Sequence, residues 1–196
     1  MKAQPFFVPP KYYPQPLHVV GEQVTVLASG VARSDDEDSL TQYPKETEMK
    51  AEPFVVSPNT YEPALNVLGV SVTVLASNIQ TQGYEITLQS GGEGAGPPPH
   101  RHVWDESFFV LRGSVEFSID EKADLCGPGT LVHLPAGTVH SYRFGTGGGA
   151  LFEIAGQGGS ATRLFAQVNR EVPPGPPDVP ALTSLLQQNG VTLMLG

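Results

Sequence analysis

Residues 94–113 read GAGPPPHRHVWDESFFVLRG, and this stretch decides the fold. Its two histidines, His100 and His102, are separated by one residue, so on a strand both side chains point to the same face. Glu106 has the same parity and adds a carboxylate to that face. Three prolines, at positions 97–99, favour an extended backbone and lack N–H donors, which suits a rigid entry into a strand. The pattern predicts a strand that presents several metal ligands on one face.

A second stretch, residues 129–140, reads GTLVHLPAGTVH and supplies His140 after a Pro-Ala-Gly turn. Three imidazoles and a carboxylate make a good site for a borderline divalent ion. We therefore expect His100, His102, Glu106 and His140 to bind one divalent transition metal. The spacing of the ligands does not distinguish Fe, Mn, Ni, Co, Cu or Zn, because metal availability and intrinsic affinity decide that choice.

The two stretches resemble the two signature motifs of the cupin superfamily. The first motif of that family runs glycine, five residues, His-x-His, three or four residues, glutamate, six residues and glycine. Its positions in this chain are Gly94, His100, His102, Glu106 and Gly113. The second motif runs glycine, five residues, Pro-x-Gly, two residues, histidine, three residues and asparagine. Its positions here are Gly129, Pro135, Gly137, His140 and Phe144, the last in place of an asparagine that varies in the family and binds no metal.

The resemblance covers roughly residues 65–170. It implies a cupin β-barrel, also called a double-stranded β-helix or jelly roll, with a metal near its centre. Three histidines and Glu106 would hold the ion and leave one or two positions for water, O₂ or a substrate oxygen. The family resemblance also implies a homodimer that exchanges N-terminal strands. Within the family, the run ESFFVLRGSVEF at Glu106–Phe117 is similar to the quercetinase-type monocupins.

Composition and strand patterning independently favour an all-β fold. The 196 residues include 22 glycines and 19 prolines, which suits short strands joined by turns and argues against a helical bundle. After the strand expected at Val72–Leu75, the predicted strands are Tyr84–Gln89, Ser107–Leu111, Ser114–Ile119, Thr130–Leu134, His140–Phe144, Ala150–Ile154 and Arg163–Val168. Short strands at this spacing predict a sandwich or barrel.

The charge and the single cysteine limit the partners and the compartment. A net charge of −9 makes nucleic acid a poor partner, because the chain repels phosphate backbones. We expect no membrane span and no signal peptide, and one cysteine, Cys126, fits a reducing compartment. The expected location is cytoplasmic. Cys126 has no base beside it in the sequence, so we do not expect it to be a nucleophile.

The N-terminal part contains a duplicated segment. Residues 2–29 (the first copy) and 50–77 (the second copy) align without gaps, share Pro5/Pro53 and Phe6/Phe54, and both end in VTVLAS. Later motifs occur once, which excludes a two-barrel protein or a solenoid. The first copy is expected to form a strand at Val24–Leu27 and to pair with a sheet edge, and we favour the edge of a second subunit. Removal of residues 1–49 is then expected to weaken self-association or stability.

Three regions follow from these patterns: an N-terminal segment with an acidic linker (1–49), the barrel (50–170) and a C-terminal tail (171–196). The proline-rich stretch at 172–180 is expected to lead into one short helix. Asp178 would cap this helix, Val179, Leu182 and Leu186 would form its apolar stripe, and Gly190 would end it.

Aromatic residues that share the parity of the metal ligands are the candidates for substrate binding. These are Trp104, Phe108, Tyr142 and Phe144. Aromatic side chains on strands more often belong to the core, so the core is the alternative for each of them. We interpret His133 as structural, and Arg112 and Arg143 as exposed charges at turns or edges.

The sequence leaves three functions open. A metal-dependent dioxygenase would bind a small aromatic or enolic substrate through a deprotonated oxygen, with Glu106 as both ligand and general base. An isomerase or lyase would use the same Lewis acid and base without O₂. The third alternative is a non-catalytic ligand-sensing or storage protein. The fold does not decide between these functions, because one fold hosts many functions.

Overall fold

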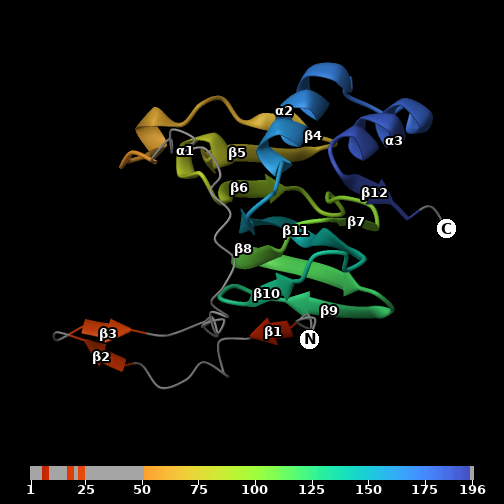
Figure 1. Ribbon diagram of the computed structural model, residues 1–196. Helices are drawn as coiled ribbons and strands as arrows, with labels where there is room; N and C mark the ends of the chain where they lie inside the picture. Colours follow the sequence, from red (N-terminus) through yellow and green to blue (C-terminus); the bar gives the residue numbers. More distant parts are fainter. Residues whose placement is uncertain (1–5, 9–16, 20–21, 25–50, 195–196) are drawn as a thin grey trace, which may run out of the picture.

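A computed structural model describes residues 6–8, 17–19, 22–24 and 51–194 of the chain (Figure 1). The strands are β1 Phe6–Val8, β2 Leu17–Val19, β3 Glu22–Val24, β4 Leu65–Val67, β5 Val70–Ala76, β6 Glu85–Gly91, β7 His100–His102, β8 Glu106–Ile119, β9 Lys122–Cys126, β10 Leu131–Leu134, β11 His140–Ala155 and β12 Val191–Leu193. The helices are α1 Asn78–Thr81, α2 Ala161–Glu171 and α3 Val179–Gln188, with a 3₁₀ turn at Pro58–Thr60. No described helix is long and apolar enough to cross a bilayer.

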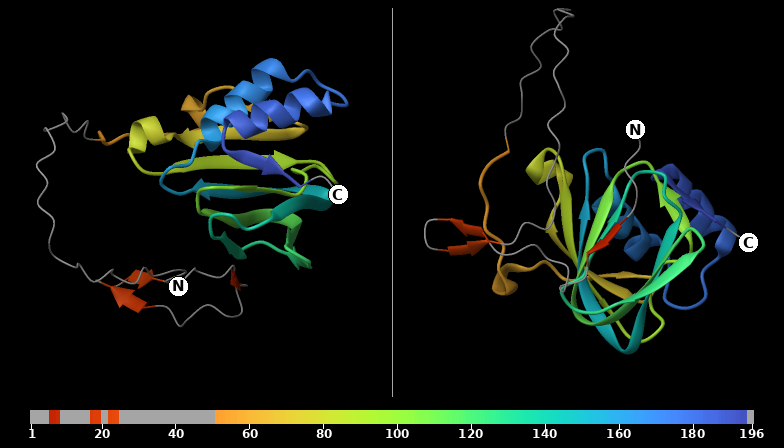
Figure 2. Two further views of the ribbon diagram at one scale, coloured as in Figure 1. Left: turned by 45° about the vertical axis from the view of Figure 1, so that its right-hand side comes forward. Right: turned by 90° about the horizontal axis from the view of Figure 1, so that it is seen from below.

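One ten-stranded sheet forms the body of the molecule and confirms the predicted all-β fold. Its main path runs β1-β10-β8-β11-β6-β5-β4, while β9 pairs with β8, and β7 pairs with both β11 and β12. All of the pairings are antiparallel. The view from below in Figure 2 shows the sheet curling round on itself, with α2 and α3 to one side.

Two buried clusters hold the fold together. The first lies between the curled strands and includes Phe108, Val110, Phe117, Val132 and Leu151. It forms because alternate residues of β8 and β11 point inward, as the burial pattern of β8 shows. The second lies between the barrel and the C-terminal helices, which close one side of the barrel with the buried residues Ala161, Leu164, Val168, Leu182, Leu185 and Leu186, while β12 adds Val191.

The strand predictions hold with two mergers and one error. Ser107–Leu111 and Ser114–Ile119 are parts of the single strand β8, and His140–Phe144 and Ala150–Ile154 are parts of β11. The predicted strand Arg163–Val168 is wrong, because these residues lie in α2. The buried residues of α2 recur at helical spacing, so its apolar stripe packs against the barrel.

The predicted C-terminal helix is confirmed as α3. A further helix that was not predicted, α2, precedes the tail. The Asp178 side chain accepts a hydrogen bond from the backbone N–H of Ala181 and caps the helix. Leu182 and Leu186 are buried as expected, whereas Val179 is 47% exposed because it lies in the first turn, outside the packed stripe.

The first copy of the duplicated segment contributes β1, which pairs with β10 of the same chain. It also contributes the two-stranded sheet of β2 and β3. Of the predicted strand Val24–Leu27, Val24 ends β3 and residues 25–27 lie outside the described part of the chain. The corresponding strand of the second copy is confirmed as β5.

Candidate metal centre

Two strands that pair with each other carry the three predicted histidine ligands. His100 and His102 lie on β7, and His140 begins β11 directly opposite His100. One ligand nitrogen from each of the three rings lies within 4.8 Å of the others. His102 and His140 are buried and His100 is half-buried, so the cluster is largely shielded from water.

Each imidazole is held in one orientation by a hydrogen bond from its Nδ1 to a nearby backbone carbonyl. The acceptors for His100, His102 and His140 are the carbonyl oxygens of Pro98, Trp104 and Thr138, at 2.9, 2.9 and 3.0 Å. An Nδ1 that carries its proton leaves Nε2 with a free lone pair, which is the form that binds a metal. The three lone pairs therefore point toward one another, as a metal site requires.

Glu106 completes the cluster. Its Oε2 atom lies 3.1 Å from Nε2 of both His102 and His140. Two ligand atoms at about 2.1 Å from an ion and at right angles to each other are about 3.0 Å apart, so this spacing fits adjacent positions around one ion. With its proton on Nδ1, His140 has none on Nε2 to donate to Glu106, and within the described chain Nε2 is one of two buried side-chain atoms that make no hydrogen bond. An ion between Nε2 and the carboxylate would satisfy both. The residues thus fit a bound divalent metal.

The charges of the cluster support the same interpretation. Burial, together with the nearby His140, lowers the pKa of His100 to about 3, so this ring is neutral and free to ligate. Burial opposes ionisation of both His102 and Glu106, but their mutual attraction outweighs it. This attraction raises the pKa of His102 and holds the pKa of Glu106 well below its usual range.

Two small cavities adjoin the cluster, with volumes of about 80 and 90 Å³. Both are lined by His100, Glu106 and Glu153, so a small molecule bound there would face the metal ligands. The opposite walls are largely apolar. β4 and the helix α2, which contributes Phe165, line both cavities, and β5 lines the first. Pockets for drug-sized ligands are about 300–1,000 Å³, so these cavities suit a much smaller molecule.

The four predicted substrate-binding residues lie at different places around this site. Phe108 and Tyr142 line the first cavity, and Trp104 lines the second. The Trp104 ring stacks on the ring of His102, with centroids 4.2 Å apart, and so supports this predicted metal ligand directly. Phe144 lines neither of these cavities and packs in the core beside Tyr142. Their role in substrate binding stays a prediction.

Sequence reasoning missed Glu153, a buried carboxyl group on β11. It accepts hydrogen bonds from Thr87 Oγ1, at 2.8 Å, and from Gln89 Nε2. The Tyr142 hydroxyl donates to the other end of the Gln89 amide. Burial and the charge of Glu106 raise the pKa of Glu153 well above its usual range. One wall of the site is therefore a polar network, and it faces the apolar wall described above.

Arg143 is also misjudged from sequence. Its Nη1 donates to the carbonyl oxygens of Gly96 and Pro97, both at 2.6 Å, and thereby braces the loop that leads to His100. Gly96 packs so closely there that a Cβ atom would lie 2.1 Å from the Tyr142 carbonyl oxygen. The loop that positions the histidine strand is thus fixed by side-chain and backbone packing, which no spacing rule predicts.

Comparison with known proteins adds three findings. Residues 85–152 match the family model of the cupin domain. A stretch of 61 residues is 43% identical to quercetin 2,3-dioxygenase of Bacillus subtilis (strain 168), and it spans 31% of this chain but only 18% of that protein. An RmlC-like cupin from Shewanella frigidimarina superposes with a TM-score of 0.52 and 16% identity, covering 58% of this chain and 99% of the other. The structural match shows a shared fold and nothing about activity.

Proposed function

Because this chain is a cupin with three histidines positioned for a metal, we propose that it is a metal-dependent dioxygenase for a small aromatic or enolic molecule. The observation that carries the proposal is the convergence of His100, His102, His140 and Glu106 beside a small, largely apolar cavity. The similarity to quercetin 2,3-dioxygenase, although limited to 61 residues, supports this activity over others of the family.

When bound, a divalent ion supplies a Lewis acid for a substrate oxygen. Glu106 lines both cavities, so its carboxylate is placed to take the proton of an enol or phenol. The apolar wall formed by Phe108, Phe165 and the strand residues excludes water from the substrate. Gln89 and Tyr142 offer hydrogen bonds on the opposite wall, which suits a substrate that carries a further polar group.

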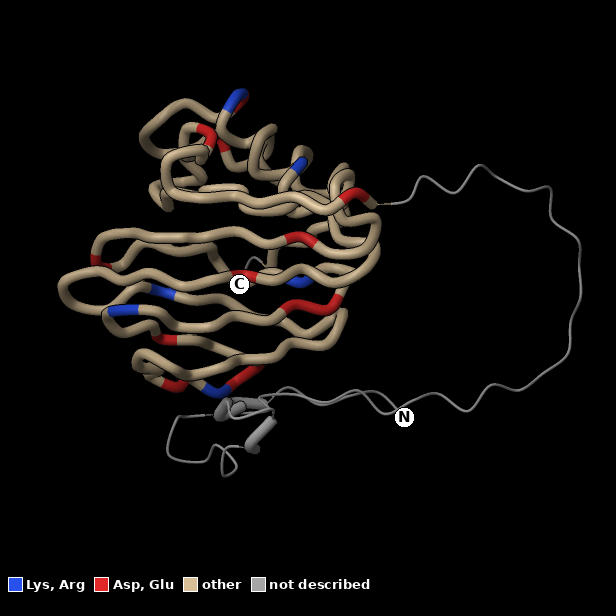
Figure 3. The backbone as a smooth tube through the Cα atoms, turned by 90° about the vertical axis from the view of Figure 1, so that its left-hand side faces the viewer, with Lys and Arg blue, Asp and Glu red and all other residues tan. Residues whose placement is uncertain are grey.

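The cavity volumes limit the substrate to a molecule about the size of one ring. Strongly anionic substrates such as nucleotide sugars fit less well, because the chain has 11 basic against 20 acidic residues. Figure 3 shows the Lys and Arg residues of the described chain few and scattered, without a basic cluster. We therefore propose monocyclic phenols and small enols as substrates.

The test combines metal analysis with oxygen-consumption assays. Purified protein loaded separately with each candidate metal is screened against small enols and monocyclic phenols, with an electrode that records O₂ uptake. We expect one metal to support O₂ consumption, and Glu106→Gln to retain part of the metal while losing turnover by about a hundredfold or more. Turnover that persists without O₂ would instead favour an isomerase or lyase, and full activity of Glu106→Gln would remove this residue from the mechanism.

Binding without turnover would contradict a catalytic role. If the metal-loaded protein binds members of the panel in calorimetry but converts none of them, a ligand-sensing or storage role replaces the proposal. The control is the protein with chelator, which should neither bind the panel through the metal nor consume O₂.

A further inference from the structure

The two small cavities beside the metal ligands share one boundary. The residues that line both include Leu68, in the turn between β4 and β5, Phe165 on α2, and the predicted ligand His100. From this boundary the first cavity extends among the barrel strands to Phe108. The second extends under the C-terminal helices to Leu186. Leu68 and Phe165 therefore border two compartments of one site.

The shared boundary is also where the site reaches the surface. Its partly exposed members are Val67, Leu68, Pro97, His100 and Phe165. Pro97 is fixed by its ring and by the hydrogen bond from Arg143, and His100 is fixed by the hydrogen bond of its Nδ1. Leu68 and Phe165 are the largest purely apolar side chains of the set, and packing alone positions them. We call these two the mouth residues.

The turn that carries Leu68 has a backbone conformation that disfavours leucine. Val67 and Val70 are paired, so Leu68 and Gly69 form a two-residue hairpin loop. Both have positive φ, 51° for Leu68 and 89° for Gly69. Such loops favour asparagine or glycine, because a Cβ atom crowds the backbone at positive φ. The Leu68 side chain is thus unfavourable for the turn itself, and its position on both cavities indicates a role in the site.

Hydrogen bonds join this turn to α2. Asn169 Oδ1, on α2, accepts from the backbone N–H of Asn66 at 2.8 Å, and Asn66 Oδ1 accepts from the N–H of Gly69 at 3.0 Å. Asn169 lies four residues after Phe165, so both side chains are on the same face of the helix. Figure 1 shows α2 lying against β4. The two mouth residues are therefore carried by elements that are bonded to each other.

We propose that Leu68 and Phe165 determine the largest substrate that reaches the metal centre. This inference rests on the proposed function, since it concerns which phenols and enols the site accepts. With both side chains in place, the compartments measure about 80 and 90 Å³, and each suits no more than one ring. Removal of either side chain joins the compartments and widens the opening. The site then accepts a fused bicyclic phenol, which the wild-type mouth excludes.

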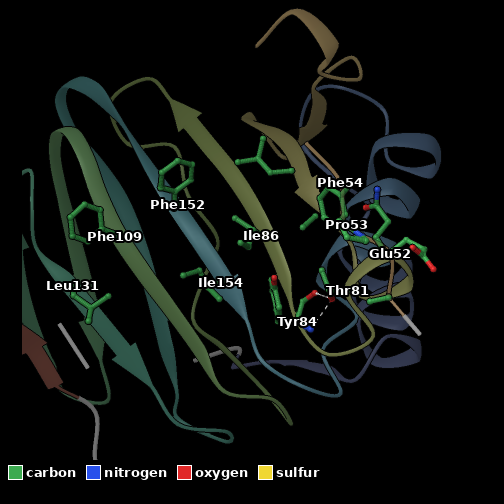
Figure 4. Close-up of a pocket in the computed structure, with 14 residues that line it drawn as sticks. Glu52, Pro53, Phe54, Thr81, Tyr84, Ile86, Phe109, Leu131, Phe152 and Ile154 are labelled. Atoms are coloured by element: carbon green, nitrogen blue, oxygen red, sulfur yellow. Dashed lines mark hydrogen bonds between the residues drawn. The ribbon is translucent and has the colours of Figure 1, made fainter. Parts of the chain in front are cut away.

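The molecule also has a larger apolar groove where a bicyclic compound could bind without the metal. This groove, of about 860 Å³, runs along the outer face of the sheet over Phe109, Phe152 and Ile154 (Figure 4). It shares no lining residue with the two cavities, because successive residues of a strand point to opposite faces of the sheet. Binding in the groove therefore depends neither on the metal nor on the mouth residues, and metal-free protein measures it.

The experiment compares the binding of phenol and of 2-naphthol to the full-length protein loaded with Zn²⁺, by isothermal titration calorimetry. Zn²⁺ has no redox chemistry, so binding is measured without O₂ turnover. The same titrations with chelator identify any binding in the outer groove. Relative to phenol, we expect Phe165→Ala to bind 2-naphthol about tenfold or more tightly than the wild type does, since a single methylene in an apolar pocket changes discrimination by about tenfold or more.

Leu68→Gly keeps the inference falsifiable if Phe165→Ala folds poorly. Glycine suits the positive φ at this position, so the turn should persist while the side chain is lost. This variant should shift the ratio of the two dissociation constants in the same direction. Arg170→Ala is the matched control on α2, because 69% of the Arg170 side chain is exposed, and it should leave the ratio unchanged.

Failure of this inference and failure of the proposed function give different results. A wild type that binds 2-naphthol through the metal as tightly as phenol, or variants that leave the ratio unchanged, would overturn the role of the mouth residues. Protein that binds phenol at the metal but consumes no O₂ with any candidate metal would contradict the dioxygenase activity and leave the mouth residues as the size limit. A metal-loaded wild type that does not bind phenol would contradict both.

Discussion

At the scale of single residues, the carbonyl-bound Nδ1 atoms of the three histidines define what the site can do. A hydrogen bond from Nδ1 fixes both the ring orientation and the tautomer, so Nε2 cannot avoid facing the centre of the cluster. Such a site is prepared for an ion before the ion arrives. Removing one ring therefore removes one metal ligand, and the two remaining rings are fixed and cannot move to replace it.

We predict that His102→Ala removes nearly all bound metal, because each lost ligand weakens an already open site. Metal content per chain, measured by elemental analysis after gel filtration, checks this. Arg101→Ala is the matched control: its side chain is exposed, lies between the two histidines and faces away from them, so the metal should be retained. Stoichiometric metal in the His102→Ala protein would refute the ligand assignment.

We predict that Glu153 contributes to the pH dependence of stability in the metal-free protein. Its pKa in the folded chain is raised by burial and by the charge of Glu106. The folded chain therefore holds a proton there that the unfolded chain releases near pH 4.3. This contribution to stability is complete below that pH and is lost as the pH rises through the raised pKa.

Glu153→Gln should abolish that pH dependence, because an amide resembles the protonated carboxyl group and does not titrate. We expect the variant to melt at a higher temperature than wild type at neutral pH and at a similar temperature at acidic pH. Thermal unfolding in the presence of chelator across this pH range is the measurement. Glu116→Gln is the matched control, because it removes an exposed carboxylate of β8 that lies outside the buried network.

The parity of side chains explains why His140 could be predicted and Glu153 could not. Inward-facing residues of β11 begin with His140, Tyr142 and Phe144, which share one parity. The register then shifts between Phe144 and Gly149 and again between Ala150 and Leu151, and afterwards Leu151, Glu153 and Ala155 are the buried residues. Such irregularities reverse the face of a strand, and nothing in the spacing of the motif reveals them.

At the scale of elements, burial and patterning decided which segments were predicted correctly. β8 alternates between buried and exposed residues, and this pattern was readable. β9 was missed because only Cys126 among its five residues is buried, so it has no alternation to detect. The segment at 163–168 was read as a strand because a short apolar run fits either structure. Packing of α2 against the barrel determined the outcome.

The helix α3 is part of the cover of the metal centre, since Leu186 lines the cavity beside His102 and Trp104. We predict that Leu186→Ala lowers the unfolding free energy by about 2–5 kcal/mol, the usual cost of truncating a buried leucine. A looser cover should also let a chelator strip the metal faster. Stopped-flow chelation kinetics and denaturant unfolding test the two effects.

Gln187→Ala is the control for this prediction, because it alters the exposed neighbour on the same helix. Equal chelation rates for Leu186→Ala and Gln187→Ala would mean that α3 does not limit access to the site, even if the unfolding free energy falls.

At the scale of the whole molecule, metal binding should appear as global stability. An ion that binds only the folded chain stabilises it by about 2.7 kcal/mol at a free concentration of 100 times its dissociation constant. For a chain of this size that corresponds to about 5–10 °C in melting temperature. Scanning calorimetry of metal-loaded and chelated protein checks this, and the His102→Ala protein should show no such shift. Identical melting temperatures for the two wild-type forms would contradict a resident metal.

At the same scale, the duplication could be recognised in the sequence, but its place in the sheet could not be predicted. The repeat itself was evident from Pro5/Pro53 and the shared VTVLAS strings, but the partner of the first copy was not. We expected its end, at Val24–Leu27, to pair with a sheet edge, and favoured the edge of a second subunit. In the structure β1, near the beginning of the first copy, pairs with β10 of the same chain. Pairing with an edge depends on which strand is left uncovered, and that is a property of the assembled sheet.

The pairing of β7 with β11 has a consequence for how the protein folds. His100 and His140 are far apart in sequence and meet only when β11 docks beside β7. Sheets built from such distant pairings fold slowly, because the intervening loop must close before any contact forms. Partly folded chains thus lack a complete set of ligands, and the ion can be captured only late, once the barrel has closed. In refolding experiments, the rate of metal uptake would therefore report the rate of the final step of folding.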